Sequence, residues 1–164
     1  MAKVKGIKKL TETINEWTMK NFGVTAVFGT DFQALPSNKI IQFTVLVDED
    51  MNEVFLTDAE ARFPEVHAHL FLWLLMHEIG HCMTDDIWDG DDEIYFAHMR
   101  ERLDDYFPCD VYAKNEWYHA IGDEYFATKW AGCYMMEHPK KMSKFNEKIN
   151  KAMIKFCRKN AITP

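Results

Sequence analysis

The chain has 164 residues, a formal net charge of −7 and a sequence pI near 5.5. This length is typical of one domain, so we expect a single domain over residues 1–164. Hydrophobic residues make up 48% and charged residues 27%, which excludes a disordered or fibrous chain. The acidic balance argues against a general nucleic-acid-binding protein, which usually carries a basic excess.

The sequence shows neither a membrane span nor a secretory signal. Its longest uninterrupted apolar run, Leu70–Met76, is far shorter than the roughly 20 residues that cross a bilayer. Residues 1–10 are basic, but no apolar signal core follows them. We therefore expect a cytoplasmic protein whose four cysteines, none of them in a C-x-x-C pair, are reduced thiols.

The N-terminal part predicts a helix followed by a small sheet. Apolar residues recur at helical spacing over residues 7–21, and Gly23 interrupts this pattern. Three segments rich in β-branched and aromatic residues predict strands: Val24–Phe28, Lys39–Val47 and Glu53–Thr57. An acidic turn joins the last two segments as a hairpin, so we expect a small antiparallel sheet.

The C-terminal part predicts helices. One helix is expected from Pro64 to Met83, and its centre is apolar on every side, which is typical of a helix buried in the middle of a domain. An acidic loop is expected over Asp85–Glu93, followed by helices over residues 94–106, 115–136 and 141–158. The fold class expected from this order is α+β, with a small sheet packed on a central helix.

The predicted central helix contains an H-E-x-x-H motif at His77–His81. Histidines four residues apart on a helix project from one face, within reach of one zinc ion. Glu78 lies about 100° around the helix, where it can accept a proton from a metal-activated water. Random occurrence is a poor explanation, because a chain of this composition should contain roughly 0.02 such motifs by chance.

A catalytic zinc also needs a third protein ligand. His67 is too distant, because it precedes His77 by about 15 Å along a helix axis. A metzincin would have glycine and histidine where this chain has Thr84 and Ile87, which excludes that pattern.

Glu124 is the best remaining candidate for the third ligand, and Asp123 is the alternative. Both lie on a separate predicted helix, 115–136. Small side chains one or two turns after Glu124 would let this helix come close to the helix that carries the histidines. These small residues are Ala127, Thr128 and Ala131.

Two segments of the chain resemble gluzincin-type zinc metallopeptidases. HEIGH at 77–81 matches their zinc-binding motif. EYFATKWA at 124–131 is similar to the E-x-x-A-D-x-[FWY]-A helix of small ImmA/IrrE-like and minimal gluzincin proteases, and of membrane-bound relatives with an EYxAD motif. The resemblance implies a zincin-like fold and one Zn²⁺ per chain.

The resemblance also implies roles for individual residues. It implies His77, His81 and Glu124 as metal ligands and Glu78 as the general base of peptide-bond hydrolysis. The chain departs from the pattern at Thr128, where the family commonly has an aspartate that can orient the first histidine. Threonine can hydrogen-bond an imidazole but adds no negative charge, so the tuning of that histidine would be weaker.

The expected substrate is a peptide or protein whose carbonyl develops negative charge as it is attacked. A hydrogen-bond donor should stabilise that oxyanion. The sequence leaves four candidates for the donor: Tyr118, His119, Tyr125 and His138. The predicted strand Glu53–Thr57 could pair with an extended substrate or be an ordinary edge strand.

Two charged segments have alternative interpretations. Asp85–Glu93 lacks the ligand spacing of an EF-hand, and a solvated acidic loop is favoured over one that selects basic substrates. The basic helix 141–158 carries an apolar stripe. It is expected to pack on the core, although such helices also bind membranes, acidic partners or nucleic acid.

The function expected from the sequence is zinc-dependent peptide-bond hydrolysis. One alternative is a metal-stabilised interaction protein that keeps the site without turnover. Another is a regulator that cleaves a single partner. No nucleic-acid partner or membrane span is expected, and the sequence does not specify the oligomeric state.

Overall fold

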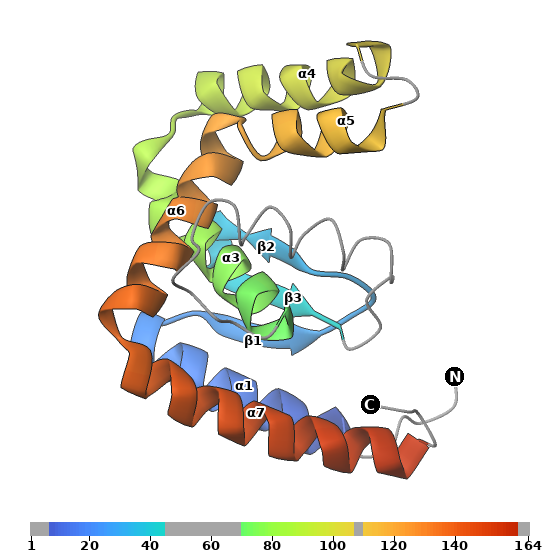
Figure 1. The fold of residues 1–164 in the computed structure, drawn as a ribbon. Coiled ribbons are helices and arrows are strands. Elements are labelled where there is room, and N and C mark those ends of the chain that lie inside the picture. Colours follow the sequence, from blue (N-terminus) through green and yellow to red (C-terminus); the bar gives the residue numbers. More distant parts are fainter. Residues whose placement is uncertain (1–6, 45–69, 107–109, 161–164) are drawn as a thin grey trace.

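The computed structural model describes residues 7–44, 70–106 and 110–160 (Figure 1). Within these ranges it contains six α-helices and one three-stranded sheet, which confirms the α+β class. No helix in these ranges combines the length and apolar character needed to cross a membrane. The helices are α1 (Ile7–Phe22), α3 (Leu70–Thr84), α4 (Gly90–Tyr106), α5 (Val111–Tyr118), α6 (Gly122–Glu137) and α7 (Pro139–Asn160).

The sheet is mixed, whereas the sequence predicted an antiparallel one. Its strands are β1 (Thr25–Phe28), β2 (Gln33–Leu35) and β3 (Ile40–Phe43), in the spatial order β1-β3-β2. The central strand β3 is parallel to β1, with Ala26 opposite Ile41, and antiparallel to β2, with Ala34 opposite Ile41.

The prediction of an antiparallel sheet was wrong because β1 and β3 are parallel, and they are parallel because, between them in the sequence, the chain forms an additional strand, β2. It has only three residues, none of them β-branched, so it gives no sequence signal. A 3₁₀ turn at Pro36–Asn38 and a left-handed Lys39 then lead directly into β3. Three features named in the sequence analysis lie outside the described residues: the predicted strand Glu53–Thr57, the predicted start of the central helix at Pro64, and His67.

Helices α1 and α7 lie side by side below the sheet (Figure 1). Leu10 and Ile14 of α1 are fully buried, and Trp17 stacks on Phe145 of α7 with ring centroids 3.7 Å apart. Gly23 ends α1 in the left-handed conformation that a helix terminus often requires. The amphipathic helix predicted over 7–21 is therefore confirmed.

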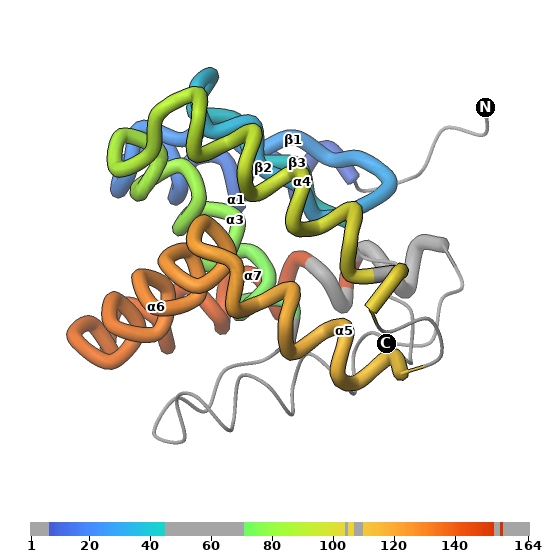
Figure 2. Tube along the Cα trace, turned by 90° about the horizontal axis from the view of Figure 1, so that it is seen from above, coloured from blue at the N-terminus to red at the C-terminus, as the bar shows by residue number. Residues whose placement is uncertain are grey.

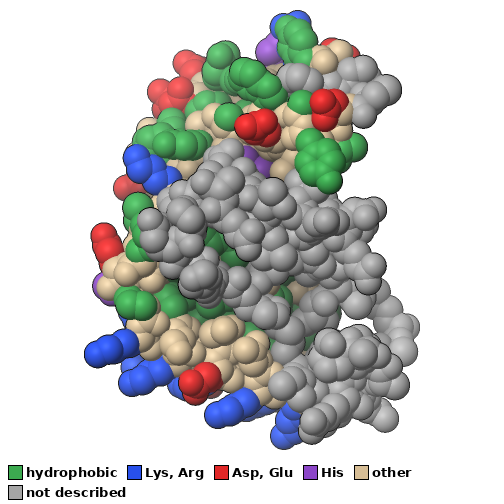
Figure 3. Space-filling model, viewed as in Figure 1, with side chains coloured by type: hydrophobic (Ala, Val, Ile, Leu, Met, Phe, Trp, Pro, Cys, Tyr) green, Lys and Arg blue, Asp and Glu red, His purple; other side chains and the backbone are tan. Residues whose placement is uncertain are grey.

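The apolar stripe of the basic helix α7 packs on the core, as expected. Met142, Phe145 and Ile149 are each no more than 5% exposed. On the face shown in Figure 3, Lys and Arg side chains gather over α1 and α7, whereas Asp and Glu are more frequent near α4 and α5.

The central helix α3 packs between the sheet and α6. Its residues 71–73, 75, 76 and 79 are almost completely buried, which agrees with a helix that is apolar all round. At its C-terminal end, the ammonium group of Lys39 donates a hydrogen bond to the carbonyl of Cys82. This contact ties the end of α3 to the turn before β3.

The helix predicted over 115–136 is two helices that meet at a change of direction. The chain leaves α5 after Tyr118 and starts α6 at Gly122. Gly122 contacts the ring of Phe96 so closely that a Cβ atom would lie 2.6 Å from it. A larger residue at this position would make the Phe96 ring move, so glycine lets α6 begin close to the ring of a residue on α4.

The segment predicted as an acidic loop is mostly helical. Asp85–Ile87 forms a 3₁₀ turn, and α4 already begins at Gly90. The Asp89 carboxylate accepts hydrogen bonds from the backbone N–H groups of Asp91 and Asp92, which caps α4. Helices α4 and α5 lie beside each other in both Figure 1 and Figure 2.

Candidate metal centre

Helix α3 brings the two histidines of the H-E-x-x-H motif together on one face. The Nε2 atoms of His77 and His81 are 3.2 Å apart, and their rings are nearly perpendicular. His77 is 4% exposed, and the side chain of His81 is 13% exposed. One turn of a buried helix therefore presents two nitrogen donors at nearly the same point.

Helix α6 supplies a carboxylate to the same point. One oxygen of Glu124, Oε2, lies 3.0 Å from Nε2 of His77 and 3.5 Å from Nε2 of His81. Glu124 is 6% exposed. The three side chains expected to bind a metal thus converge, and they form a group that could hold one ion.

The close approach of α6 to α3 depends on Gly80 within the motif. A Cβ atom on Gly80 would lie 2.5 Å from the carbonyl oxygen of Ala127 and 2.9 Å from its Cα atom. These are backbone atoms, which cannot move away as the end of a flexible side chain can. Small residues on both helices therefore set the distance at which Glu124 reaches the histidines.

Thr128 orients the first histidine. Its Oγ1 atom is 3.1 Å from Nδ1 of His77, and the residue is 2% exposed. When Nε2 binds a metal, Nδ1 carries the hydrogen and donates it to this hydroxyl oxygen. The threonine that departs from the gluzincin pattern therefore still contacts the imidazole, without adding a charge.

The charges of the cluster are strongly coupled. Burial alone would raise the pKa of Glu124, but hydrogen bonds from His77 and His81 outweigh it and hold this pKa well below its usual range. Burial alone would lower the pKa of His81, but the hydrogen bond to Glu124 reverses the effect and raises it. The carboxylate is therefore ionised and favours the protonated form of His81.

Glu78, the expected general base, lies next to this cluster and is 8% exposed. Burial raises its pKa, the two histidines oppose the change, and Glu124 and Asp31 add to it. A buried carboxylate with a raised pKa accepts a proton more readily than one in water.

Asp123, the alternative third ligand, does not join the cluster. Its two carboxylate oxygens accept hydrogen bonds from Nη1 of Arg100 at 2.8 and 2.9 Å. Arg100 belongs to α4, so this pair ties α4 to the first turn of α6. This partner comes from the predicted helix 94–106, and nothing in the sequence paired it with Asp123.

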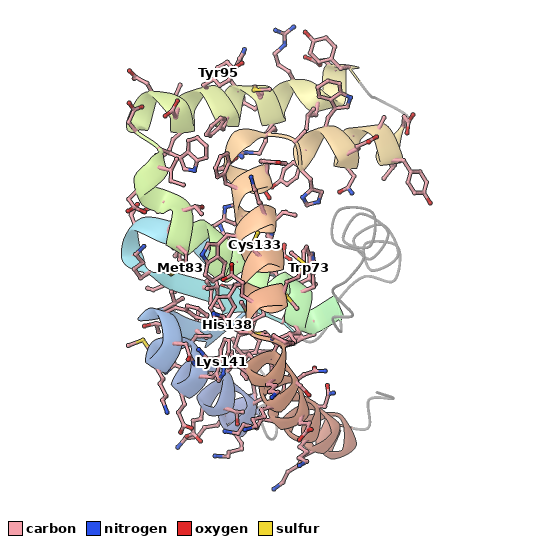
Figure 4. The ribbon with its side chains drawn as sticks, turned by 60° about the vertical axis from the view of Figure 1, so that its left-hand side comes forward. Trp73, Met83, Tyr95, Cys133, His138 and Lys141 are labelled. Atoms are coloured by element: carbon pink, nitrogen blue, oxygen red, sulfur yellow. The ribbon has the colours of Figure 1, made fainter. Side chains whose placement is uncertain are left out.

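Of the four candidate hydrogen-bond donors to the oxyanion, two lie near the proposed metal ligands and two do not. Burial raises the pKa of Tyr118, and its interaction with Glu124 raises it further, which places the phenol at the cluster. The ring of His119 lies 6.0 Å from that of His77. By contrast, Tyr125 is 41% exposed, and His138 follows the far end of α6, near Lys141 (Figure 4).

The donor set and its spacing fit a zinc ion. Two imidazoles and one carboxylate form a ligand set that catalytic zinc sites use. Two atoms bound to the same tetrahedral ion at its usual distances are about 3.3 Å apart. The three ligand atoms here are 3.0, 3.2 and 3.5 Å from one another, so little movement is needed to receive the ion.

A pocket of about 70 Å³ adjoins the cluster, with His81 in its wall. It lies where the end of α3, the first half of α4 and the start of α6 meet. The start of α6 is distant in the sequence from α3 and the first turns of α4, which is why the sequence did not indicate the pocket.

No protein-family model, curated protein or solved structure matches the chain.

Proposed function

We propose that the chain is a zinc-dependent metallopeptidase that hydrolyses peptide bonds. The observation that carries the proposal is the convergence of His77, His81 and Glu124 within 3.0–3.5 Å, with Glu78 beside them on α3. One zinc ion per chain would be held by these three side chains. The gluzincin-like and zincin-like assignments suggested by HEIGH belong to the same proposal.

The chain's own residues account for the proton transfers of such a reaction. Zinc, when bound, supplies a Lewis acid that polarises the substrate carbonyl and acidifies water. The carboxylate of Glu78 takes a proton from the attacking water and returns it to the leaving amine nitrogen. Thr128 holds His77 in the tautomer that leaves Nε2 free to bind the metal.

Stabilisation of the oxyanion is assigned to α5 and the turn that follows it. Tyr118 and His119 are the two candidates that the fold places near the ligands. A phenol with a raised pKa keeps its proton at neutral pH and can donate it in a hydrogen bond.

The decisive test separates metal binding from turnover. Glu78→Gln should keep one zinc per chain and lose peptide cleavage by about 10²–10⁴-fold, the usual contribution of a general base. Glu124→Gln should lose zinc, whereas the matched variant Asp123→Asn should retain it. Zinc content by mass spectrometry and cleavage of a peptide library would give both results. Loss of zinc in Asp123→Asn, with retention in Glu124→Gln, would contradict the ligand assignment.

The same experiment tests the non-catalytic alternative. The ligands lie on α3 and α6, which have the most extensive contact between elements in the described residues, so an ion would fasten these two helices. In a metal-stabilised interaction protein, zinc removal would lower the thermal midpoint. Glu78→Gln would then leave the biological activity intact.

A further inference from the structure

The pocket beside His81 has walls from three helices. The end of α3 and the segment that leads to α4 form one side, α4 forms another, and Asp123 of α6 and Pro36 of the turn before β3 also line it. Because His81 is one of the proposed ligands, any group that enters the pocket lies next to the metal. A substrate side chain bound there would flank the bond that is cut.

The wall of the pocket carries an excess of negative charge. Asp85, Glu93 and Asp123 line it, against one cation, Arg100. Arg100 is already hydrogen-bonded to both oxygens of Asp123. Within the described part of the chain, Asp85 and Glu93 have no ion-pair partner. The pocket therefore offers two uncompensated carboxylates to a guest.

Aromatic rings complete the wall. Trp88 and Phe96 both line the pocket and pack edge to face, with ring centroids 5.0 Å apart. Such rings bind the methylene stem of a long cationic side chain, and the face of a tryptophan also attracts its charge. The indole Nε1 of Trp88 is buried and has no hydrogen-bond acceptor among the described residues.

We propose that this pocket is a substrate subsite that accepts a lysine or arginine side chain, with Asp85 and Glu93 as the specificity-determining residues. The inference rests on the proposed peptidase function and adds a substrate class to it. Aromatic walls alone would suit any apolar side chain, and the two carboxylates restrict the choice to a cation.

Other acidic residues of the same segment have a different role. The backbone N–H groups of Asp91 and Asp92 bind the Asp89 carboxylate in the cap of α4, and neither residue lines the pocket. Asp86, next to Asp85, is exposed and also outside the pocket wall. The segment therefore contains matched controls with the same charge change as the pocket residues.

The test begins with a peptide library digested by the zinc-loaded protein. Mass spectrometry should show lysine or arginine enriched at one position relative to the cut. Two peptides that differ only by lysine or norleucine at that position then give a ratio of kcat/KM values. Asp85→Asn and Glu93→Gln should each lower this ratio by about fivefold, as expected for one charge pair in a nearly aqueous environment. Asp86→Asn and Asp91→Asn should leave it unchanged.

Binding of the same two peptides to Glu78→Gln, measured by fluorescence anisotropy, gives a second readout that does not depend on turnover. An unchanged ratio in both pocket variants, or an equal fall in the controls, would overturn the subsite while leaving the peptidase intact. If no peptide were cleaved but lysine-dependent binding still required Asp85 and Glu93, the proposed function would fail and the assignment of a cation-binding pocket would stand.

Discussion

The pair α3–α6 and the pair α4–α5 meet at the same site but are built differently. In α3–α6, Gly80 and Ala127 bring two backbones into direct contact, and the ligands are buried between them. In α4–α5, a small cluster of Phe96 and Leu103 with Ile121 supplies the buried apolar contacts.

Much of the surface of α4–α5 remains exposed. Tyr95 is 59% exposed on the outer side of α4 (Figure 4), and Trp117 of α5 is 55% exposed. Regions with few buried apolar contacts open at a lower free-energy cost than packed cores. The site therefore combines a tightly packed pair, α3–α6, which holds the proposed ligands, with a more lightly packed pair, α4–α5, from which α4 contributes to the pocket wall.

The largest expected effect comes from breaking the contact between α3 and α6. Gly80→Ala should lower the free energy of unfolding by about 1–3 kcal/mol, the usual cost of overpacking. Zinc affinity should fall with it, because the added methyl group displaces the helix that carries Glu124. Urea unfolding with and without zinc would measure both effects.

A matched control for this substitution lies on α4. Gly90 has open space around the position of a Cβ atom, so Gly90→Ala should be neutral or slightly stabilising. If Gly80→Ala were as stable as the wild type and bound zinc equally well, the close approach of the helices would not govern the site.

Removal of the hydroxyl that orients His77 should have the next largest effect. Thr128→Val keeps the shape of the side chain but leaves Nδ1–H of His77 buried without this acceptor. Zinc affinity should fall by about 10–100-fold, while Thr128→Ser should stay close to the wild type. Competition titrations with a chromophoric chelator would measure the zinc affinity of each variant. Equal zinc affinities of the Thr128→Val and Thr128→Ser variants would refute the orienting role.

The pH dependence of zinc binding should follow the raised pKa of His81. Burial lowers this pKa, but the hydrogen bond to Glu124 and its charge outweigh burial and raise it, so a proton competes with the metal more strongly than it would at a free histidine. Zinc affinity should therefore rise with pH through the pKa of His81, by up to about tenfold per pH unit. His138→Gln, which changes an exposed histidine far from the ligands, should give the same curve. An affinity that did not vary between pH 6 and 8 would contradict the assignment.

The smallest effect on overall stability is expected from breaking the ion pair that joins α4 to α6. Arg100→Met removes the ion pair with Asp123, whose partly exposed groups contribute no more than about 1 kcal/mol. Amide exchange should accelerate in α4–α5 and stay slow in α3–α6. Arg102→Met is the control, because in the described part of the chain it removes a contact with the Tyr106 ring and no ion pair. Equal acceleration in all four helices would show that the two pairs do not open separately.

The sequence predicted the parts of the site that one helix encodes by itself. The spacing of His77 and His81 fixes their common face, and the small residues after Glu124 correctly indicated a close helix contact. One helix alone could not decide whether Glu124 or Asp123 is the third ligand. Asp123 is bound by Arg100, which lies on another helix.

The errors in the fold have a similar cause. The mixed sheet depends on β2, which is short and lacks β-branched residues, and on pairing between segments separated along the chain. At the break between α5 and α6, Gly122 contacts the ring of Phe96, a residue from another helix. Tertiary contacts of this kind override local propensity and leave little trace in a periodic pattern.

Thr128 has a consequence for how selectivity can arise. With zinc in place, the two positive charges of the ion would balance the two negative charges of ionised Glu78 and Glu124. The hydroxyl group of Thr128 adds no further charge. An aspartate there would make the centre anionic and attractive to every cationic peptide. An electroneutral centre leaves the discrimination between substrates to its surroundings, so preference could change through surface substitutions while the hydrolytic apparatus stays the same.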